Sequence, residues 1–349
     1  MSINLLSLFS GIGAFEKALS NVGLDYDLVG YSEIDKYPSA AYSAIHNVSE
    51  DKNLGDIKEI DAGELDDFNL MTYGFPCQDI SIAGGKEGFS KSKETRSSLL
   101  WEAMRIAKEK KPEVMVAENV PNLLSDKFKQ DLNSWLGFLT NIGYKTKIIA
   151  LNAQSFGVPQ NRKRVFIISS LMNLNLKVET KNKDITLKDI LDKKVKKKYY
   201  LNQEYHKRYK KSLNNKKLQD KIPQLGDIYI KGTTQPLRAK GTNSRQWVHD
   251  INYLSGSILA SDYKQPKQVD IKSFDKTGYI LRKLTPLEYF RLMGFEDSDY
   301  YRAREKLENK FYHGNDRSDT RMYKMAGNSI VVPVLEEIFK EIYNKQAEG

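Results

Sequence analysis

Residues 4–22 read NLLSLFSGIGAFEKALSNV, and this stretch decides the fold. It begins with a short apolar run, passes through two closely spaced glycines and continues with apolar residues at helical spacing. A strand, a glycine turn and a helix in this order are typical of the start of a parallel α/β sheet. We therefore expect a strand over Asn4–Phe9, a helix over Phe15–Val22, and a turn between them that a ligand can approach closely.

The same alternation continues to about residue 170. Apolar runs of strand length alternate with segments of helical periodicity. This pattern indicates an α/β fold, with a mostly parallel sheet and helices on both of its faces. Ligands of such sheets bind outside the carboxyl ends of the strands. The further strands are expected over Leu28–Ser32, Asn69–Tyr73, Glu113–Ala117 and Arg164–Ser169, and the further helices over Ser39–Ile45, Leu99–Lys108 and Leu132–Ile142.

The composition limits the class of protein. The chain has 349 residues, of which 40% are hydrophobic, so it can bury a sizeable core. Its apolar runs are shorter than the ~20 residues that span a bilayer, and its first residues lack the pattern of a signal peptide. A single cysteine excludes an intramolecular disulfide framework. We expect a cytoplasmic protein with no membrane partner.

The excess of positive charge lies in one segment. Residues 177–240 hold 19 Lys and Arg against 7 Asp and Glu, whereas the rest of the chain holds 36 against 38. A solvated lysine-rich surface would explain this block, and so would a polyanionic partner such as nucleic acid. If the segment faces a polyanion, the Lys193–Lys198 run is the expected phosphate contact, because clustered lysines act as point charges.

A change of texture after Ser170 indicates a second, smaller domain. Lys, Asn and Tyr dominate to about residue 280, but the segment carries more Tyr and Trp than a disordered region usually does. Beyond it we expect a helix over Leu284–Met293, with Thr285 as its cap and Glu288 completing a capping box. A terminal helix is expected over Val331–Ile342.

Three features of the first region favour a ligand that contains adenosine. Gly11 and Gly13 follow the first strand, but the third position of a dinucleotide fingerprint is Glu16, which weakens a pyrophosphate site. Glu33 follows Gly13 by 20 residues and ends the second strand, where an acid can bind ribose hydroxyls. Asp56 stands where a third strand would end and could accept a hydrogen bond from an adenine amino group. Taken singly, the glycines could be a structural turn and each acid a cap.

A second group of residues suggests a reactive site. Cys77, the only cysteine, follows a strand and precedes the long polar loop Asp79–Ser98, which has the length of a lid. A lone cysteine is usually inert, but a turn is an unusual place for a core residue. Glu118 ends the next strand, and Arg162 and Arg164 precede or begin the last one. A capping acid and a solvated basic turn are the structural alternatives. Together, a thiol, a carboxyl group and two guanidinium groups suit an electron-poor ring.

These pieces occur in a characteristic order along the whole chain. They are Phe9-Ser10-Gly11-Ile12-Gly13, Glu33, Asp56, Pro76-Cys77-Gln78, Glu118-Asn119-Val120, Gln160-x-Arg162-x-Arg164, Arg282-Lys283-Leu284-Thr285-Pro286 through Gly294-Phe295, and Gly327-Asn328-Ser329. In this order the chain closely resembles bacterial DNA cytosine carbon-5 methyltransferases of restriction-modification type. It departs from the usual family pattern at Ala14, where glycine is common.

The resemblance implies the following chemistry. Cys77 would add to carbon 6 of a cytosine flipped out of duplex DNA, and the methyl group of S-adenosylmethionine would move to carbon 5. Glu118 would hydrogen-bond ring nitrogen 3 and the amino group, and Arg164 the ring carbonyl. Arg162 would order the site or bind a phosphate. The 79–98 loop would close over the base.

The resemblance also implies a cofactor pocket and a division of the chain. S-adenosylmethionine would be bound without a metal by Phe9, Gly11, Ile12, Gly13, Glu33, Asp56, Ile57, Pro76, Asn328 and Ser329. Residues 1–171, completed by 315–349, would form a Rossmann-like S-adenosylmethionine-dependent methyltransferase domain. Residues 172–314 would hold the target recognition domain and its connecting helix. The partner would be double-stranded DNA, the enzyme a monomer, and any restriction endonuclease would act separately.

Other functions remain open at this point. A transfer-RNA cytosine methyltransferase shares these motifs but typically has a more compact recognition region. A DNA-binding regulator with an inactive enzyme fold would not need Cys77, Glu118 and Arg164. A nucleotide-dependent dehydrogenase would explain neither Pro76-Cys77-Gln78 nor the basic segment. The recognised DNA sequence does not follow from these residues.

Overall fold

The computed structural model describes residues 2–76, 99–180, 184–216, 228–233, 247–272 and 280–343. Cys77 and the expected 79–98 loop lie outside these ranges. The chain divides into two compact units. The first comprises Met1–Asn152, Lys163–Glu179 and Val332–Gly349, and the second comprises Ala153–Arg162 and Thr180–Val331.

The first unit is built on a six-stranded sheet in the order β2-β1-β3-β4-β7-β5. The first four strands in this order run parallel, and β7 runs antiparallel to both β4 and β5. The α/β fold with a mostly parallel sheet is thus confirmed. The strands are β1 (Ile3–Leu8), β2 (Tyr26–Ser32), β3 (Leu70–Tyr73), β4 (Val114–Asn119), β5 (Lys145–Asn152) and β7 (Lys163–Ser170).

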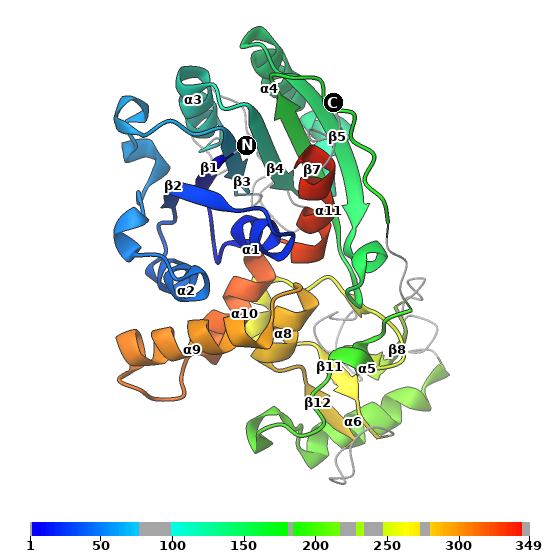
Figure 1. Cartoon of the computed structure of the whole chain (residues 1–349). Helices are drawn as coiled ribbons and strands as arrows, with labels where there is room; N and C mark the ends of the chain where they lie inside the picture. Colours follow the sequence, from blue (N-terminus) through cyan, green and yellow to red (C-terminus); the bar gives the residue numbers. More distant parts are fainter. Residues whose placement is uncertain are drawn as a thin grey trace. The chain divides into compact units, whose positions relative to one another are not determined.

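Helices cover both faces of this sheet (Figure 1). α1 and α11 pack against each other on one face, where the rings of Phe15 and Phe339 meet edge to face at 6.4 Å. α3 and α4 pack on the opposite face. The helices of this unit are α1 (Ala14–Asn21), α2 (Lys36–His46), α3 (Leu100–Lys110), α4 (Lys129–Asn141) and α11 (Val332–Tyr343).

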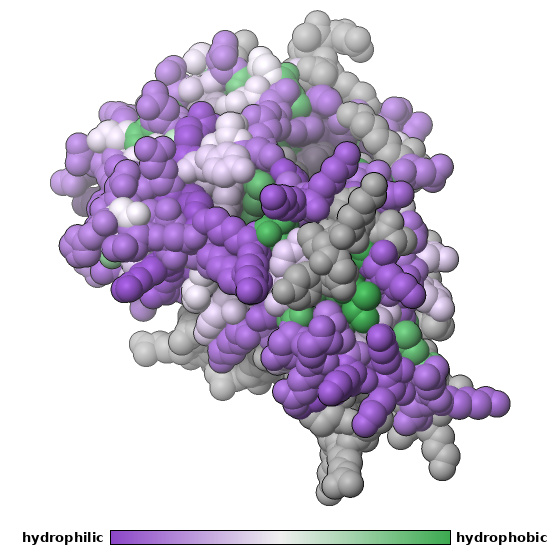
Figure 2. All heavy atoms as spheres, turned by 90° about the horizontal axis from the view of Figure 1, so that it is seen from below, coloured by the Kyte–Doolittle hydropathy of each residue, from purple (hydrophilic) through white to green (hydrophobic). Residues whose placement is uncertain are grey.

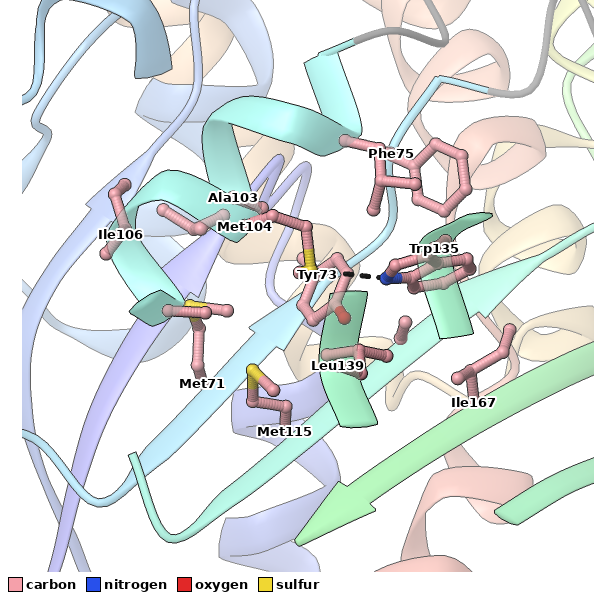
Figure 3. Packing of buried hydrophobic residues seen from close by; sticks show 14 of the residues in the cluster. Met71, Tyr73, Phe75, Ala103, Met104, Ile106, Met115, Trp135, Leu139 and Ile167 are labelled. Atoms are coloured by element: carbon pink, nitrogen blue, oxygen red, sulfur yellow. Dashed lines mark hydrogen bonds between the residues drawn. The ribbon is translucent and has the colours of Figure 1, made fainter. Parts of the chain in front are cut away.

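Alternate residues of the strands form the core beneath α3 and α4 (Figure 3). Met71 and Tyr73 of β3 and Met115 of β4 point to this face, as expected for side chains that alternate along a strand. Trp135 of α4 fills the centre, and its indole N–H donates to the sulfur of Met104 at 3.2 Å. The core therefore fixes the strands whose ends carry the predicted reactive residues.

The second unit contains a four-stranded sheet in the order β12-β11-β9-β8, and a short parallel pair of β6 with β10. Its strands are β6 (Gln160–Asn161), β8 (Ile230–Thr233), β9 (Trp247–Asp250), β10 (Ser255–Gly256), β11 (Gln268–Asp270) and β12 (Leu281–Lys283). Its helices are α5 (Leu187–Ile190), α6 (Gln203–Leu213), α8 (Pro286–Leu292), α9 (Asp297–Tyr312) and α10 (Asp319–Asn328), with a 3-10 helix over Ala260–Lys264.

The helix expected after residue 284 is confirmed with its cap. Thr285 precedes α8, its hydroxyl accepts a hydrogen bond from the N–H of Glu288 at 3.2 Å, and the carboxylate of Glu288 accepts one from the N–H of Thr285 at 2.7 Å. Glu288 also forms a fully buried ion pair with Arg282 at 2.6 Å. Removing either partner would leave an uncompensated buried charge, so this pair holds β12 against α8.

The boundaries of the two units differ from those expected from the sequence. Residues 153–162 and 315–331 belong to the second unit, and the boundary near residue 171 falls at 179 instead. The first of these segments contains β6, which pairs with β10. The last contains α10, whose Gly327 approaches the backbone of the 3-10 helix so closely that a Cβ would lie 2.3 Å from the carbonyl carbon of Leu259.

Candidate active site

One edge of the sheet in the first unit gathers most of the predicted site residues. Leu8, the last residue of β1, lies beside Ser32 of β2 and Tyr73 of β3, and Tyr73 lies beside Ala117 of β4. Because β7 is antiparallel, its first residues lie beside the last residues of β4. The segments at this edge are Phe9–Gly13, Glu33, Gly74–Pro76, Glu118 and Arg164.

Backbone geometry explains the two glycines after β1. Gly11 has a φ of 57° and Gly13 a φ of 76°, a region that residues with a Cβ rarely adopt. A Cβ on Gly13 would lie 2.1 Å from Nε2 of His46, a nitrogen that is hydrogen-bonded to the carbonyl oxygen of Ile12 at 3.1 Å. A Cβ on Gly11 would meet no atom of the described chain within 4 Å. The turn is therefore closely packed at Gly13 and open at Gly11.

Phe9, which directly follows β1, has a strained backbone. Its φ of 54° lies in the left-handed region, which costs a residue with a side chain about 1–2 kcal/mol. The half-buried ring packs on the core beneath α3 and α4. Such strain is often found at functional sites, where the surrounding structure fixes a backbone that the residue alone would not adopt.

Glu33 is tied to the glycine turn. Its Oε2 accepts a hydrogen bond from the backbone N–H of Gly11 at 3.1 Å, and its Oε1 accepts one from the N–H of Asp35 at 2.8 Å. The side chain of Asn53 pairs with both the N–H and the carbonyl oxygen of Glu33, at 3.1 and 2.9 Å. The acid expected to bind ribose and the turn expected to approach the cofactor are therefore held together.

Two residues beside Glu33, Asn53 and Ile34, were not predicted from the sequence. Asn53 fixes the backbone of Glu33, but an isolated asparagine before a loop carries no signal of this. Ile34 exposes 75% of its surface, which makes it the most exposed of the large apolar side chains in the described chain. The only sequence signal for Ile34 was its position directly after Glu33, which was predicted to bind a ligand.

The strand expected to end at Asp56 is not formed. Only one parallel bridge, between Tyr31 and Asn53, extends the sheet there. Gly55 then takes a φ of 70°, which ends the extended backbone, and Asp56 caps a 3-10 turn by accepting a hydrogen bond from the N–H of Lys58 at 3.0 Å. Asp56 is exposed, whereas the side chain of Ile57 is buried in the core.

Glu16 explains why the dinucleotide fingerprint is incomplete. Its side chain is fully buried and accepts a hydrogen bond from the hydroxyl of Tyr42 at 2.9 Å. Burial raises the pKa of this carboxyl group, because the charged form loses its hydration. The position that would be the third glycine thus holds a polar group inside the protein, beneath the turn.

Glu118 and Arg164 form an ion pair across neighbouring strands. Nε of Arg164, near the start of β7, lies 2.9 Å from Oε1 of Glu118, near the end of β4. The side chains are 16% and 12% exposed, so the pair is shielded but still reachable from solvent. The structure thus brings together the carboxyl and guanidinium groups that the sequence placed at strand ends.

The turn after β3 leads to Cys77. Phe75 is buried and Pro76 is half-buried, and both lie at the same edge as Glu118. β3 and β4 are parallel neighbours, so the turn after β3 lies at the same edge of the sheet as Glu118, as expected. The structure describes this turn as far as Pro76. Cys77 itself lies outside the described residues.

Arg162, Asn328 and Ser329 belong to the second unit. The guanidinium group of Arg162 is 3% exposed and donates to the carbonyl oxygens of Ile258 and Ser329 at 2.7 and 2.8 Å, and to that of Gly327 at 3.3 Å. Of the two expected roles, ordering the site and binding a phosphate, this geometry favours the first. The side chain of Asn328 is exposed at the end of α10.

Two lysines of the expected phosphate-binding run already have acidic partners. Lys196 and Lys198 pair with Asp316, and Lys198 also pairs with Asp319 at 2.8 Å. The hydrogen bond from Lys196 holds the pKa of Asp316 at about 2, so the carboxylate stays charged at neutral pH. These lysines therefore neutralise charge within the second unit.

Two further properties concern the described ranges only. They contain no group of three or more His, Cys, Asp or Glu side chains placed to hold a metal ion. None of their helices combines the length and the apolar character needed to cross a membrane.

The chain is similar to known proteins along almost its full length. The family model for C-5 cytosine-specific DNA methylase matches residues 3–344. The orphan methyltransferase M.SPRI of Bacillus phage SPR is 32% identical, with 99% of each chain covered. The type II methyltransferase M2.ScrFI of Lactococcus lactis subsp. cremoris is also 32% identical, with 99% of this chain and all of the other covered. Among solved structures, the Dnmt2 methyltransferase of S. pombe aligns over the full length of both chains with a TM-score of 0.68 at 17% identity, a likeness of fold.

The packing of Gly13 leads to a prediction about stability. Gly13→Ala should lower the free energy of unfolding by more than Gly23→Ala, measured by urea denaturation. Both glycines have positive φ, so each alanine costs about 1–2 kcal/mol in backbone strain. Only the Cβ at position 13 would collide with His46, since the space at Gly23 is open. Equal losses would mean that α2 does not support the turn.

Proposed function

Because this chain belongs to the C-5 cytosine-specific DNA methylase family, we propose that it methylates carbon 5 of a cytosine flipped out of duplex DNA, through a covalent adduct of Cys77 at carbon 6. The observation that supports this most strongly is the Glu118–Arg164 pair, at the edge of the sheet where the turn leading to Cys77 begins. The flipped base is needed because its carbon atoms are inaccessible in a stacked duplex.

Cys77 would act as the nucleophile. Carbon 5 of cytosine is a poor nucleophile, but addition of the Cys77 thiolate to carbon 6 gives the ring enamine character. S-adenosylmethionine would supply an electrophilic methyl group to carbon 5 and would leave as S-adenosylhomocysteine. Loss of the carbon-5 proton to water and expulsion of Cys77 restore the aromatic ring and the free thiolate.

Glu118 and Arg164 would hold the ring from its polar edge. The carboxyl group of Glu118 would hydrogen-bond ring nitrogen 3 and the amino group, which would offset the negative charge that develops when Cys77 adds. The guanidinium group of Arg164 would bind the ring carbonyl oxygen. Their mutual ion pair orients both groups before a base arrives, so little reorganisation is needed during the reaction.

The residues around the glycine turn fit S-adenosylmethionine. The open space at Gly11 allows the backbone to approach a ligand, and the carboxylate of Glu33, fixed beside Gly11, can accept hydrogen bonds from ribose hydroxyls. Phe9 and the exposed Ile34 offer apolar surface for an adenine ring or a methionine chain. Asp56, Ile57, Pro76, Asn328 and Ser329 are proposed to complete the pocket, with Ile57 contributing through its backbone because its side chain is buried.

In the second unit, Arg162 and the recognition region are proposed to have supporting roles. Arg162 would hold the Gly327–Ser329 segment in place through its hydrogen bonds. Residues 172–314 would hold the target recognition domain and its connecting helix. The enzyme would act as a monomer on double-stranded DNA, with any restriction endonuclease acting separately. The name of the matching family favours DNA over transfer RNA as the substrate.

A suicide substrate tests the role of Cys77. Duplex DNA with 5-fluorocytosine at the target position should stay covalently bound to the enzyme after methyl transfer, because fluorine cannot leave as a proton does. Denaturing electrophoresis would reveal the adduct. Cys77→Ser should give none, and since the chain has no other cysteine, no other thiol can replace it. An adduct formed equally well by this variant would remove Cys77 from the mechanism.

Calorimetry tests the role of Glu33. Glu33→Ala should weaken S-adenosylmethionine binding by about 1–3 kcal/mol, the scale of a hydrogen bond that involves a charged group. DNA affinity in the absence of cofactor should not change. Glu109→Ala, which removes an exposed acid of α3 in the same unit, is the control. If the two variants bind the cofactor equally well, Glu33 only stabilises the turn.

A further inference from the structure

Helix α6 is firmly fixed to the sheet of the second unit. Asn202 caps its first turn, and the side chains of His206, Tyr209 and Ser212 form its buried stripe. Tyr209 packs on Val248 and Leu281, and its hydroxyl donates to Asp270 of β11 at 2.9 Å. The opposite face of the helix is therefore held in a defined orientation.

That opposite face is basic toward the C-terminal end of the helix, and the one acid on the same side, Glu204 in the first turn, forms an ion pair with Arg208. Lys207, Lys210 and Lys211 have the i, i+3, i+4 spacing that places side chains on one side of a helix, and all three are exposed. Within the described part of the chain, none of them forms an ion pair or hydrogen bond, in contrast to Lys196 and Lys198. Burial lowers the pKa of His206, and the nearby charge of Lys210 lowers it further. The helix dipole stabilises positive charge in the last turn of a helix, which explains Lys210 and Lys211. It does not explain Lys207, which lies before the last turn of α6.

We propose that this face of α6 binds the phosphate groups of duplex DNA. The proposal rests on the proposed function and names the part of the second unit that makes the electrostatic contact. Ammonium groups that have no acidic partner among the described residues can bind a polyanion without breaking internal ion pairs. In the view of Figure 2, the surface outside the grey residues is mostly hydrophilic, and its apolar residues lie in small areas.

Two matched double variants test this proposal. Lys207→Gln with Lys210→Gln, and Lys196→Gln with Lys198→Gln, remove the same charge from the same unit. Binding to a non-specific DNA duplex should be measured over a salt series. The α6 variant should flatten the log–log slope by about one unit per lysine, while the other pair should leave it unchanged.

The possible results distinguish the role of α6 from the proposed function of the protein. Equal slopes for both variants, whether changed or unchanged, would overturn the role of α6. If wild type shows steep salt dependence and methylates the duplex, the proposed function stands regardless of that result. If wild type neither binds nor methylates duplex DNA, the proposed function itself fails.

Asn119, in the first unit, forms a hydrogen bond that supports a second inference, which does not depend on α6. Asn119 ends β4 with 2% of its surface exposed, and its amide nitrogen donates to the carbonyl oxygen of Phe75 at 3.2 Å. Its amide oxygen accepts from the N–H of Val120 at 2.8 Å. The ring of Phe75 is fixed as well, because it meets the indole of Trp135 edge to face at 5.5 Å (Figure 3).

We infer that Asn119 is a positioning residue for the turn that leads to Cys77. The core fixes the ring of Phe75, and Asn119 fixes its backbone carbonyl two residues before the thiol. On the proposed function, this places the nucleophile relative to Glu118, which is the neighbour of Asn119 in β4. A misplacement of about 1 Å can cost ~100-fold in rate, so loss of this bond should slow the chemistry rather than weaken substrate binding.

The test compares Asn119→Ala and the isosteric Asn119→Asp with Asn69→Ala. Asn69 also makes two hydrogen bonds, with the N–H of Asn4 and the carbonyl oxygen of Ser2, but just before β3, at the opposite edge of the sheet. Both Asn119 variants should lower kcat by ~100-fold with little change in KM for DNA. They should also change the pH profile of alkylation of the single thiol, which needs no activity. Asn69→Ala should affect stability alone.

Normal kcat and normal thiol alkylation in both Asn119 variants would overturn this inference. The activity of the wild-type protein and its covalent adduct with DNA are measured separately. If they are absent, the proposed function fails, and not the role of Asn119.

Discussion

The ion pair between Glu118 and Arg164 depends on one reversal of strand direction. Four strands of the sheet run parallel and end at one edge, but β7 runs antiparallel and begins there. A parallel β7 would place Arg164 at the far edge, away from Glu118. The reversal therefore puts a guanidinium group beside a carboxyl group, at the edge reached by the glycine turn and the turn before Cys77. The proposed chemistry depends on this gathering of groups.

Motifs that are far apart in the sequence are explained by contacts within each unit. Glu33 and Gly11 lie together because the carboxylate of Glu33 accepts a hydrogen bond from the backbone N–H of Gly11. Gly327 belongs with Arg162 because the guanidinium group binds its carbonyl oxygen, and it must be glycine because the backbone near Leu259 leaves no room for a Cβ. Each motif thus combines residues that would meet a ligand with residues that only hold the backbone in place.

The sequence predicted the fold where periodicity was strong. Every expected strand and helix of the first region was found except the strand expected to end at Asp56, because buried faces impose a regular apolar pattern. β5 was missed because it is the outermost strand, paired only with β7, and none of its eight residues is buried, which removes the apolar alternation. Asp56 was placed at a strand end because the turn at Gly55 was not recognised. The partners of Lys196 and Lys198 were unpredictable, since Asp316 and Asp319 lie more than a hundred residues away.

In the proposed reaction, a cytosine of duplex DNA receives a methyl group at carbon 5. The most direct measurement supplies the protein with S-adenosylmethionine carrying an isotopically labelled methyl group, and offers duplex DNA and transfer RNA in separate reactions. The nucleosides are then analysed by mass spectrometry. Labelled 5-methyl-2′-deoxycytidine from the DNA, with no labelled 5-methylcytidine from the RNA, is the predicted result. Label in the RNA alone, or in neither nucleic acid, would contradict the account.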